Sequence, residues 1–356
     1  MNPPLALLLF IIVFLPGVAR AGNLSGLDKT ADVTPAMLKR AAQFRAAIQT
    51  DGGRFRGGVY VYGHRSVRDH AAAPEKLAAR LGLLGFTDIY LTCDRNVKDE
   101  NAPAREWRRV FIRDAHRHGM RVHAQTLERT KLFVDDQAVV EDCVAVLEYN
   151  KAVAAGERFD GVAADLEPHS MKRNDARRPK GLTLVWDSEK NSGIGKDNDL
   201  LLKRTADVLA LARKTIDPLP LRQAVNYGFQ TRHDAGATAN GGAGQFLQSC
   251  DALIVMAYSN KKERIWNVMT APTVRAAGNK PACVSACIKT SHGTKDGKVD
   301  PTSLQPLGWE NMIDTINYVM SKGRAEPAFM GVDVYEYQGF EMMWTGTVAG
   351  QPGQQQ

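Results

Sequence analysis

Residues 159–168 read FDGVAADLEP, an apolar run that ends in two carboxylates separated by one residue, Asp165 and Glu167. Side chains alternate between the two faces of a strand, so both acids point to the same side. Like charges held within several Å raise the pKa of one group, which lets a carboxylic acid stay protonated near neutral pH and donate a proton. The segment therefore predicts a catalytic pair; the alternative is a strand that ends in two solvated acids.

Seven further runs rich in Val, Ile and Tyr occur along the chain: GGVYVYG (57–63), TDIYLTCD (87–94), RVHAQTLE (121–128), LRQAVNYGF (221–229), ALIVMAYSN (252–260), ACVSACIKT (282–290) and FMGVDVYEY (329–337). Helical periodicity separates most of them, at residues 74–84, 104–118, 137–155, 200–216 and 310–323. Eight strands alternating with helices predict an α/β fold, a single-domain (β/α)8 TIM barrel over residues 54–345. A doubly wound open sheet is the competing fold, but no Gly-rich phosphate fingerprint follows the first strand.

The start of the chain has the features of a secretory signal peptide. Residues 5–15 are almost wholly apolar, and Ala19-Arg20-Ala21 has the small-x-small pattern of a signal peptidase site. We predict cleavage after Ala21 and a secreted or periplasmic protein; the alternative is a retained anchor, because little positive charge precedes the apolar run. We expect a linker and helix at residues 22–53 and a polar, disordered tail at residues 346–356. No later segment is expected to span a membrane.

Charge and cysteine content narrow the classes of partner. The formal net charge of +7 falls by one, to +6, when Arg20 leaves with the signal peptide. This excess suits an anionic cell-surface polymer, and no basic motif indicates nucleic acid. The five cysteines lack paired CxxC spacing and the histidines are scattered, so we expect neither a metal nor a cofactor. Most of the cysteines are expected to be small buried apolar residues.

In a TIM barrel the chemistry lies where the strands end, so polar residues at the C-terminal ends of the predicted strands should converge. Amides and carboxylates bind sugar hydroxyls and aromatic faces stack on pyranose rings, so such a set predicts a carbohydrate-binding cleft. The residues at these ends are His64, Asp94, Glu128, Asp165, Glu167, Asn226, Tyr227, Tyr258, Asn260, Lys289, Tyr335 and Glu336. Trp186 and Trp344 are further candidates for stacking, with a role in the core as the alternative.

The fourth predicted strand resembles that of glycoside hydrolase family 18, the chitinase-like barrels, whose fourth strand reads approximately DGxDxDxE. The matching residues are Asp160, Gly161, Asp165 and Glu167, and Ala163 stands where the family has an acid. In the family that acid supports the next Asp from within the barrel. Its replacement by Ala163 therefore affects the orientation and charge of Asp165.

Three other predicted strands carry weaker matches to the same family. In LIVMAYS, Met256 and Tyr258 resemble the sixth-strand MxY motif, whose tyrosine lies beside the reacting sugar, and Ser259 replaces the acid that often follows. Tyr335 stands in the eighth strand for the tryptophan that forms the floor of the family's subsite. Tyr62 lies where the first strand of the family often has an aromatic residue.

The resemblance implies a secreted glycoside hydrolase that cleaves an amino-sugar-containing glycan, with chitin-like, peptidoglycan-like and biofilm polysaccharides as candidates. Glu167 would protonate the leaving oxygen, the N-acetyl carbonyl of the substrate would attack the anomeric carbon, and Asp165 would orient that amide. An ionised Asp165 would keep Glu167 protonated until proton transfer, and Tyr258 would hydrogen-bond the acetamido oxygen. The expected substrate-binding residues are Tyr62, Asn226, Tyr227, Tyr258, Tyr335, Glu336 and Trp344.

Two alternatives stay open. A second carboxylate, Glu128 or Glu336, would act with Glu167 if the mechanism uses a direct nucleophile, and the carboxyl separation would decide between retention and inversion. The substitutions at Ala163, Ser259 and Tyr335 also fit a non-catalytic glycan-binding protein on the same barrel. The retained Glu167 favours catalysis, because a binding protein needs no proton donor at that place.

Overall fold

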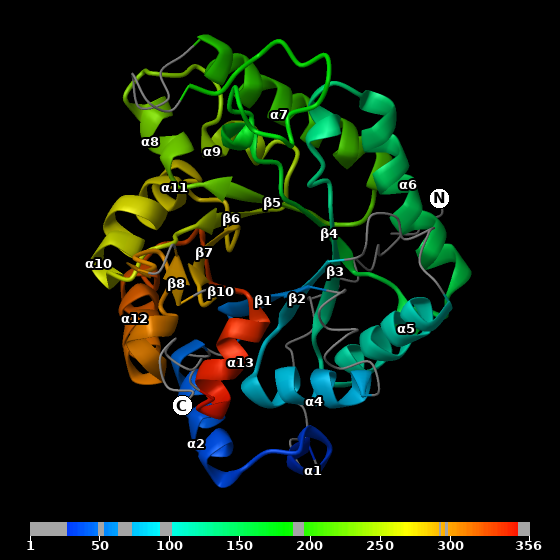
Figure 1. The fold of residues 1–356 in the computed structure, drawn as a ribbon, viewed down its shortest axis with the longest axis vertical. Helices are drawn as coiled ribbons and strands as arrows, with labels where there is room; N and C mark the ends of the chain where they lie inside the picture. Colours follow the sequence, from blue (N-terminus) through cyan, green and yellow to red (C-terminus); the bar gives the residue numbers. More distant parts are fainter. Residues whose placement is uncertain are drawn as a thin grey trace, which may run out of the picture.

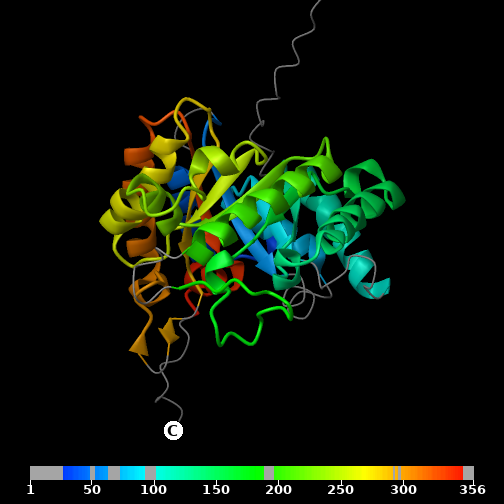
Figure 2. The ribbon, with the colours of Figure 1, turned by 90° about the horizontal axis from the view of Figure 1, so that it is seen from above.

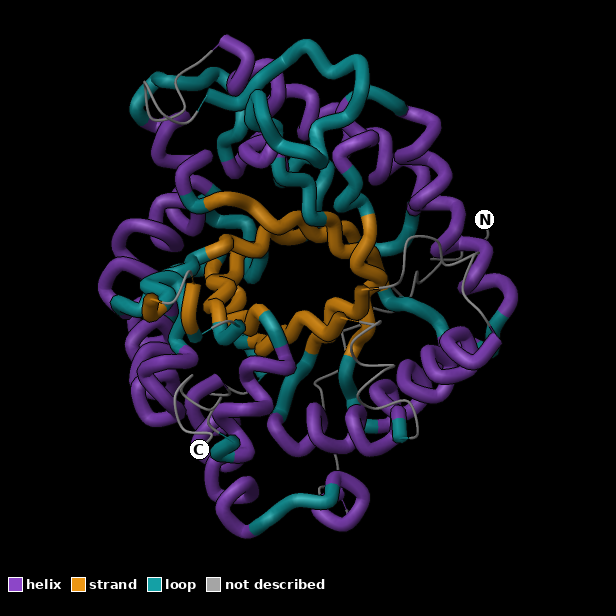
Figure 3. The backbone as a smooth tube through the Cα atoms, viewed as in Figure 1, coloured by secondary structure: helices purple, strands orange, loops and turns teal. Residues whose placement is uncertain are grey.

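The computed structural model describes residues 27–48, 53–62, 73–92, 102–187, 196–291, 293–295 and 298–347. Eight parallel strands in this part of the chain form a closed barrel, in the order β1-β10-β7-β6-β5-β4-β3-β2 (Figure 3). The predicted single-domain (β/α)8 barrel is thus confirmed. The strands are β1 (Arg56–Tyr62), β2 (Asp88–Thr92), β3 (Arg121–Thr126), β4 (Gly161–Ala164), β5 (Leu221–Asn226), β6 (Ala252–Met256), β7 (Val284–Lys289) and β10 (Phe329–Tyr335).

Helices surround the barrel on its outside (Figure 1). Five of them match the helical segments predicted between the strands: α4 (Pro74–Leu84), α5 (Ala102–Arg117), α6 (Asp136–Ala152), α7 (Lys196–Ile216) and α12 (Gly308–Gly323). At the ends of the described chain lie α1 (Leu27–Ala31), α2 (Pro35–Ile48) and α13 (Tyr337–Thr345).

Shorter elements were not predicted. They are α8 (Gly228–Asp234), α9 (Ala243–Phe246), α10 (Lys262–Arg264), a π-helical segment (Ile265–Thr270), α11 (Ala271–Ala276), and a hairpin of β8 (Thr294–Lys295) and β9 (Lys298–Val299). Short 3₁₀ turns occupy Thr130–Phe133, Ala155–Glu157, Pro168–Ser170 and Gln305–Leu307. Most of these elements lie after β5, where the connections are built from several short pieces.

Local sequence signals set the ends of two helices. Pro74 begins α4, where its missing N–H costs no hydrogen bond, and Gly85 follows the helix with φ +81°, which glycine adopts without a steric penalty. Asp135 caps α6, because its carboxylate accepts hydrogen bonds from the N–H groups of Gln137 (3.0 Å) and Ala138 (3.2 Å). These caps explain why the observed helix bounds lie close to the predicted ones.

The side chains of the strands divide into two sets. Residues such as Val59, Val61 and Ile89 point outward and pack with the helices in the larger apolar core. Alternation directs their neighbours in sequence into the barrel. The smaller apolar cluster inside the barrel consists of Tyr60, Tyr90, Ala163, Ile254 and Cys287.

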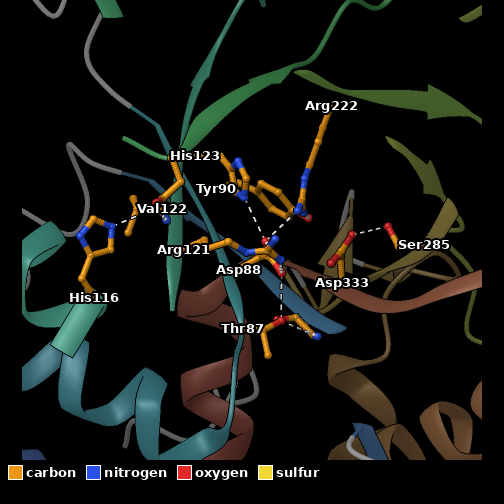
Figure 4. Close-up of polar contacts among 12 residues, drawn as sticks. Thr87, Asp88, Tyr90, His116, Arg121, Val122, His123, Arg222, Ser285 and Asp333 are labelled. Carbon is orange, nitrogen blue, oxygen red and sulfur yellow. Dashed lines mark hydrogen bonds and ion pairs between the residues drawn. The ribbon is translucent and has the colours of Figure 1, made fainter. Parts of the chain in front are cut away.

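A buried charged layer occupies the barrel interior toward the N-terminal ends of the strands (Figure 4). Asp88 accepts hydrogen bonds from Nη2 of Arg222 at 2.8 Å and from Nε2 of His123 at 2.9 Å, and Arg121 lies 2.7 Å from the same carboxylate. Arg222 also donates to the hydroxyl of Tyr90 at 2.8 Å. Burial opposes the ionisation of Asp88, but these cationic and N–H partners outweigh it and hold its pKa well below the usual value.

Asp333 on β10 lies beside this layer and accepts a hydrogen bond from the hydroxyl of Ser285 (Figure 4). Burial raises the pKa of Asp333 to about 6. The neighbouring strand β1 has a glycine at this level, because a Cβ on Gly58 would lie 2.8 Å from the ring of Tyr90 and would also meet the carboxylate of Asp333. Because Gly58 has no side chain, the ring of Tyr90 and the carboxylate of Asp333 can occupy this space.

Replacing Gly58 by alanine is expected to lower the free energy of unfolding by about 3 kcal/mol, because the added methyl group must displace a buried ring and a buried carboxylate. Chemical denaturation followed by circular dichroism measures the change. Gly244→Ala is the matched control, since no atom lies within 4 Å of its added Cβ. Equal stability of the two variants would show that the charged layer accommodates the methyl group.

The two ends of the described chain meet on the outside of the barrel, where α2 and α13 pack side by side (Figure 1). Nε1 of Trp344 donates to the carbonyl of Met37 at 2.8 Å, and Nη1 of Arg40 donates to the carbonyl of Trp344 at 2.9 Å. Trp344 is 0% exposed. The prediction that Trp344 binds substrate is therefore wrong, because its ring belongs to the core between these helices.

Several sequence-based predictions lie outside the described residues. They concern the signal peptide, the tail from residue 348 onward, His64, Asp94 and Cys93. The other four cysteines are buried and unpaired: Cys143, Cys250, Cys283 and Cys287. In the described part of the chain, no helix has both the length and the apolar character needed to cross a membrane.

Candidate active site

The candidate acids lie where β4 ends, at the C-terminal mouth of the barrel. The long segment after β4 and the β8–β9 hairpin lie at this same end (Figure 2). Asp165 directly follows β4 and continues the set of residues that point into the barrel, with Ala163 one inward position below it. Glu167 immediately precedes the 3₁₀ turn Pro168–Ser170.

Asp165 is an enclosed carboxyl group. Its Oδ1 is buried and has no hydrogen-bond partner among the described residues. Burial, followed by the charges of Glu167 and Glu128, raises the pKa of Asp165 well above its usual value. The electrostatic effect of Glu128 places the end of β3 close to the pair, as its position at a strand end predicted.

Glu167 has a different environment, with 32% of its side chain exposed. Its Oε2 lies 4.0 Å from Nη1 of Arg177, and its Oε1 lies 3.7 Å from Nε2 of His169. Burial raises the pKa of Glu167, and the positive charge of Arg177 partly offsets the rise. Burial and nearby cationic side chains lower the pKa of His169 to about 4, so its imidazole is neutral near pH 7.

The two carboxyl groups are distinguished by their surroundings. Like charges resist simultaneous ionisation, so the titrations of the two carboxyl groups depend on each other. Asp165 is the more enclosed group, with a pKa well above its usual value, and Glu167 has the guanidinium of Arg177 beside it, which favours its ionised form. Burial and the neighbouring carboxylates both act against the ionised Asp165 that the resemblance implies.

Four tyrosines line the mouth around Asp165. The ring of Tyr335 is central, with its centroid 5.7 Å from that of Tyr60, 5.8 Å from Tyr62 and 5.5 Å from Tyr258. Asp165 contributes to the raised pKa of each of the four, so it lies close enough to interact electrostatically with all of them. Burial raises the pKa of Tyr335 to about 12, so its hydroxyl stays protonated near neutral pH.

Tyr60 was missed by the sequence analysis, although strand alternation places it one inward position below Tyr62. Ala163, where the resemblance implies an acid, is buried against Tyr60, Tyr90 and other members of the inner cluster. The position of Ala163, where the family has an acid, is therefore surrounded by apolar side chains.

Glu336 is buried beside the tyrosines, after a cis peptide bond that joins it to Tyr335. Its charge contributes to the raised pKa values of Tyr62 and Tyr335. The hydroxyl of Thr290 donates to its carbonyl oxygen at 2.9 Å. The structure thus places Glu336 at the mouth, near the aromatic groups that were predicted with it.

Asn226 and Tyr227 have local roles at the end of β5. Oδ1 of Asn226 accepts a hydrogen bond from the N–H of Gly228 at 2.9 Å, which holds the turn into α8. Tyr227 is half-buried and packs against the outer apolar core. Its ring does not join the four tyrosines of the mouth, because it lies one residue out of phase with the inward-pointing positions of β5.

The segment after Glu167 forms a packed wall with Trp186 inside it. The indole lies against His169 and Phe229, with centroid distances of 6.4 Å and 5.8 Å, and the guanidinium of Arg232 lies 5.8 Å from its centroid. The backbone N–H of Trp186 donates to the carbonyl of Met171 at 2.9 Å. Trp186 is buried, which favours the core role over sugar stacking.

The site offers a proton donor, a second carboxyl group and neutral hydroxyl groups at one mouth. Within the described residues, no group of three or more His, Cys, Asp or Glu side chains is arranged to hold a metal ion. Glu167 reaches solvent and has a raised pKa, so it can meet a ligand and donate a proton to it. Glu128, an exposed residue after β3, also has a raised pKa.

No protein-family model and no curated protein sequence matches the chain. A GH18 chitinase from Pseudoalteromonas aurantia is 13% identical, with 83% of this chain and 99% of that chain covered and a TM-score of 0.45. A GH5_18 protein from Streptomyces cattleya in complex with GlcNAc is 15% identical, with 79% and 70% covered and a TM-score of 0.49. A putative deoxyribose-phosphate aldolase from Toxoplasma gondii is 11% identical, with 86% and 94% covered and a TM-score of 0.46. These likenesses leave the activity of this chain to be inferred from its own residues.

Proposed function

We propose that this protein is a glycoside hydrolase that cleaves an amino-sugar-containing glycan. The observation that carries the proposal is the carboxyl pair at the barrel mouth, in which Asp165 is enclosed and Glu167 reaches solvent. Glycoside hydrolases usually cleave the glycosidic bond with two carboxyl groups that lie in different environments. The four tyrosines support it as well, because their rings and hydroxyl groups suit a sugar.

In the proposed reaction Glu167 is the general acid that protonates the leaving oxygen. Substrate binding would exclude water from the mouth, and the positive charge that develops on the sugar ring would favour ionisation of Asp165. An ionised Asp165 would then oppose loss of the proton from Glu167, which is the group that faces the ligand. Asp165 would orient and stabilise the acetamido group of the substrate, with Tyr258 as a hydrogen-bond partner.

A direct nucleophile is the alternative within the same function. Glu128 lies close enough to affect the pKa of Asp165, and its own pKa is raised by desolvation and by the charges of Asp142 and Glu167. A carboxylate positioned in this way could attack the anomeric carbon or activate a water. The anomeric configuration of the first product separates these routes: substrate assistance and direct attack retain it, and activation of a water inverts it.

The proposal is tested by incubating the purified protein with N-acetylated, partly deacetylated and peptidoglycan-derived oligosaccharides. Mass spectrometry detects shorter products and identifies the linkage, and proton NMR during the reaction gives the anomeric configuration. A parallel preparation of Glu167→Gln controls for contaminating enzymes. Binding of these sugars without products from the wild type would instead favour a non-catalytic glycan-binding protein on the same barrel.

Asp165→Asn is expected to shift the alkaline limb of the kcat/KM profile to lower pH by about one unit. The neutral amide removes the like charge that opposes ionisation of Glu167, while Arg177 remains 4.0 Å from it, so the pKa of Glu167 falls. Asp207→Asn, at an exposed position on α7, is the control and should leave the profile unchanged. An unshifted limb in Asp165→Asn would mean that the two carboxyl groups titrate independently.

We also propose that the chain is exported, on the strength of the apolar residues 5–15 and the Ala19-Arg20-Ala21 site. The exported protein is expected to begin at Gly22, and N-terminal sequencing of the protein recovered from the periplasm or medium measures this. An intact start at Met1 in the recovered protein would favour a retained anchor. The net positive charge suits an anionic cell-surface polymer as a partner.

A further inference from the structure

Gln125 is a buried amide on β3 that the proposed chemistry does not yet use. It is 3% exposed, and neither its Nε2 nor its Oε1 has a hydrogen-bond partner among the described residues. It points into the barrel, because it lies two residues after His123, which contacts Asp88 there. Buried amide groups rarely lack hydrogen-bond partners, so we expect a polar group within reach of the Gln125 side chain.

Strand register places two polar groups near Gln125. Thr92 lies directly opposite it on β2, but the hydroxyl of Thr92 already donates to the carbonyl of Val61 at 3.1 Å. On the other side Gln125 pairs with Ala163 across the β3–β4 contact, and Asp165, just after β4, is the next inward position. A strand spacing of about 4.8 Å and a rise of about 3.3 Å per residue put the two Cα atoms about 8 Å apart. The lengths of a glutamine and an aspartate side chain span this distance with one hydrogen bond between them.

The amide of Gln125 and the carboxyl group of Asp165 can also satisfy each other's hydrogen-bonding requirements. Oδ1 of Asp165 is a buried oxygen without a partner among the described residues, and the amide of Gln125 supplies both an N–H donor and a carbonyl acceptor. Ala163 lies between them on the inner face and carries no polar atom. We propose that Gln125 is a positioning residue that holds the carboxyl group of Asp165 by a hydrogen bond during turnover. This inference rests on the proposed function for its role in catalysis. The hydrogen bond itself is part of the proposal, because the two side chains are neighbours by register but do not hydrogen-bond in the structure.

An amide suits this place because it satisfies Asp165 in both protonation states. Its Oε1 accepts from a protonated carboxyl group, and its Nε2–H donates to an ionised one. The hydrogen bond to the ionised form is the stronger of the two, because it is charge-assisted. Gln125 therefore favours ionisation of Asp165, the state in which Asp165 would stabilise a developing positive charge.

Other titratable groups face Asp165 from every side of the mouth, and all of them remain in place when Gln125 is changed. They come from β1, β3, the segment after β4, the end of β6, β7 and β10, and are Tyr60, Tyr62, Glu128, Glu167, Tyr258, Cys287 and Tyr335. The charges of Glu167 and Glu128 raise the pKa of Asp165, whereas the tyrosine hydroxyl groups are uncharged near neutral pH. Gln125 is an uncharged amide positioned to lower that pKa.

The test is the titration of Asp165 itself, measured by NMR on protein labelled with carbon-13 at the aspartate carboxyl carbons. Asp165→Asn assigns the resonance, and Glu167→Gln shows how far the coupled charge moves it. Gln125→Leu keeps the approximate volume and removes the hydrogen bond, so the pKa of Asp165 should rise by about one unit. Gln230→Leu, at a buried glutamine in α8, is the matched control and should leave it unchanged.

Gln125→Glu provides a second variant in case the leucine does not fold. It keeps the shape and adds a like charge beside Asp165, so it should raise the pKa by more than Gln125→Leu does. An unchanged pKa in folded Gln125 variants overturns the proposal, as does a loss of folding in Gln125→Leu together with an unmoved pKa in Gln125→Glu. If the pKa of Asp165 shifts in these variants but the wild-type protein cleaves no glycan, the hydrogen bond is supported and the proposed function is refuted.

Discussion

Glu167→Gln is expected to lower kcat by a factor of about 100 or more on any glycan that the wild type cleaves. The amide keeps the size and the hydrogen-bonding capacity of the side chain but has no proton to give to the leaving oxygen. Glu167 is the acid whose side chain is 32% exposed at the mouth, so its replacement changes the group that meets the substrate. Steady-state kinetics and single-turnover measurements of the chemical step both report the loss.

Affinity separates the loss of a proton donor from the loss of a binding contact. Isothermal titration calorimetry with an oligosaccharide should give a Kd within about threefold of the wild-type value, because the amide still accepts and donates hydrogen bonds. Glu141→Gln is the matched control, since Glu141 is an exposed residue on the outer helix α6. A variant that loses affinity and turnover in the same proportion would show Glu167 to be a binding residue alone.

Asp88→Asn is expected to lower the free energy of unfolding by about 3–5 kcal/mol, because the buried guanidinium of Arg222 would lose its anionic partner at 2.8 Å. Both side chains are nearly fully buried, so water cannot replace the missing charge. The substitution also weakens the hydrogen bond to His123 and the ion pair with Arg121. Urea denaturation at pH 7 measures the loss.

The pH dependence of this effect has a definite sign. The pKa of Asp88 is lower in the folded protein than in the unfolded chain, so its stabilising contribution is present above the unfolded pKa and is lost as the pH falls toward the folded one. The difference between wild type and Asp88→Asn should therefore shrink in acid. Asp207→Asn breaks an exposed pair with Lys203 and should cost less than about 1 kcal/mol. A similar small cost for Asp88→Asn would show that the buried layer does not depend on its charge.

The strands of the barrel could be predicted because strands buried on both faces read as short apolar runs. The runs at residues 57–63 and 329–337 contain β1 and β10, which close the barrel. The elements between β5 and β7 could not be predicted in the same way. Helices such as Ala243–Phe246 and Lys262–Arg264 are too short to show a period of 3.6 residues, and their form depends on packing.

The candidate site shows a similar division. Spacing singled out Asp165 and Glu167, but their pKa values depend on burial and, for Glu167, on Arg177, which reaches it from a long irregular segment. Trp344 was misassigned because it was treated as an isolated aromatic residue. Its spacing from Tyr337 and Phe340, seven and four residues along α13, is that of a buried helix face, and all three are buried.

The contacts between α2 and α13 have a consequence for how the chain reaches its folded state. The hydrogen bond from Trp344 to Met37 joins residues 307 apart in the sequence, and β1 pairs with β10 over a comparable separation. A nascent chain can pair β1 with β10 only after β10 has been synthesised, and it can form the hydrogen bond from Trp344 to Met37 only after α13 has been synthesised as well. Such long-range contacts slow folding. Until β10 is available, β1 keeps an unpaired edge that can associate with other chains. The barrel therefore closes late, after nearly all of the described chain has been synthesised.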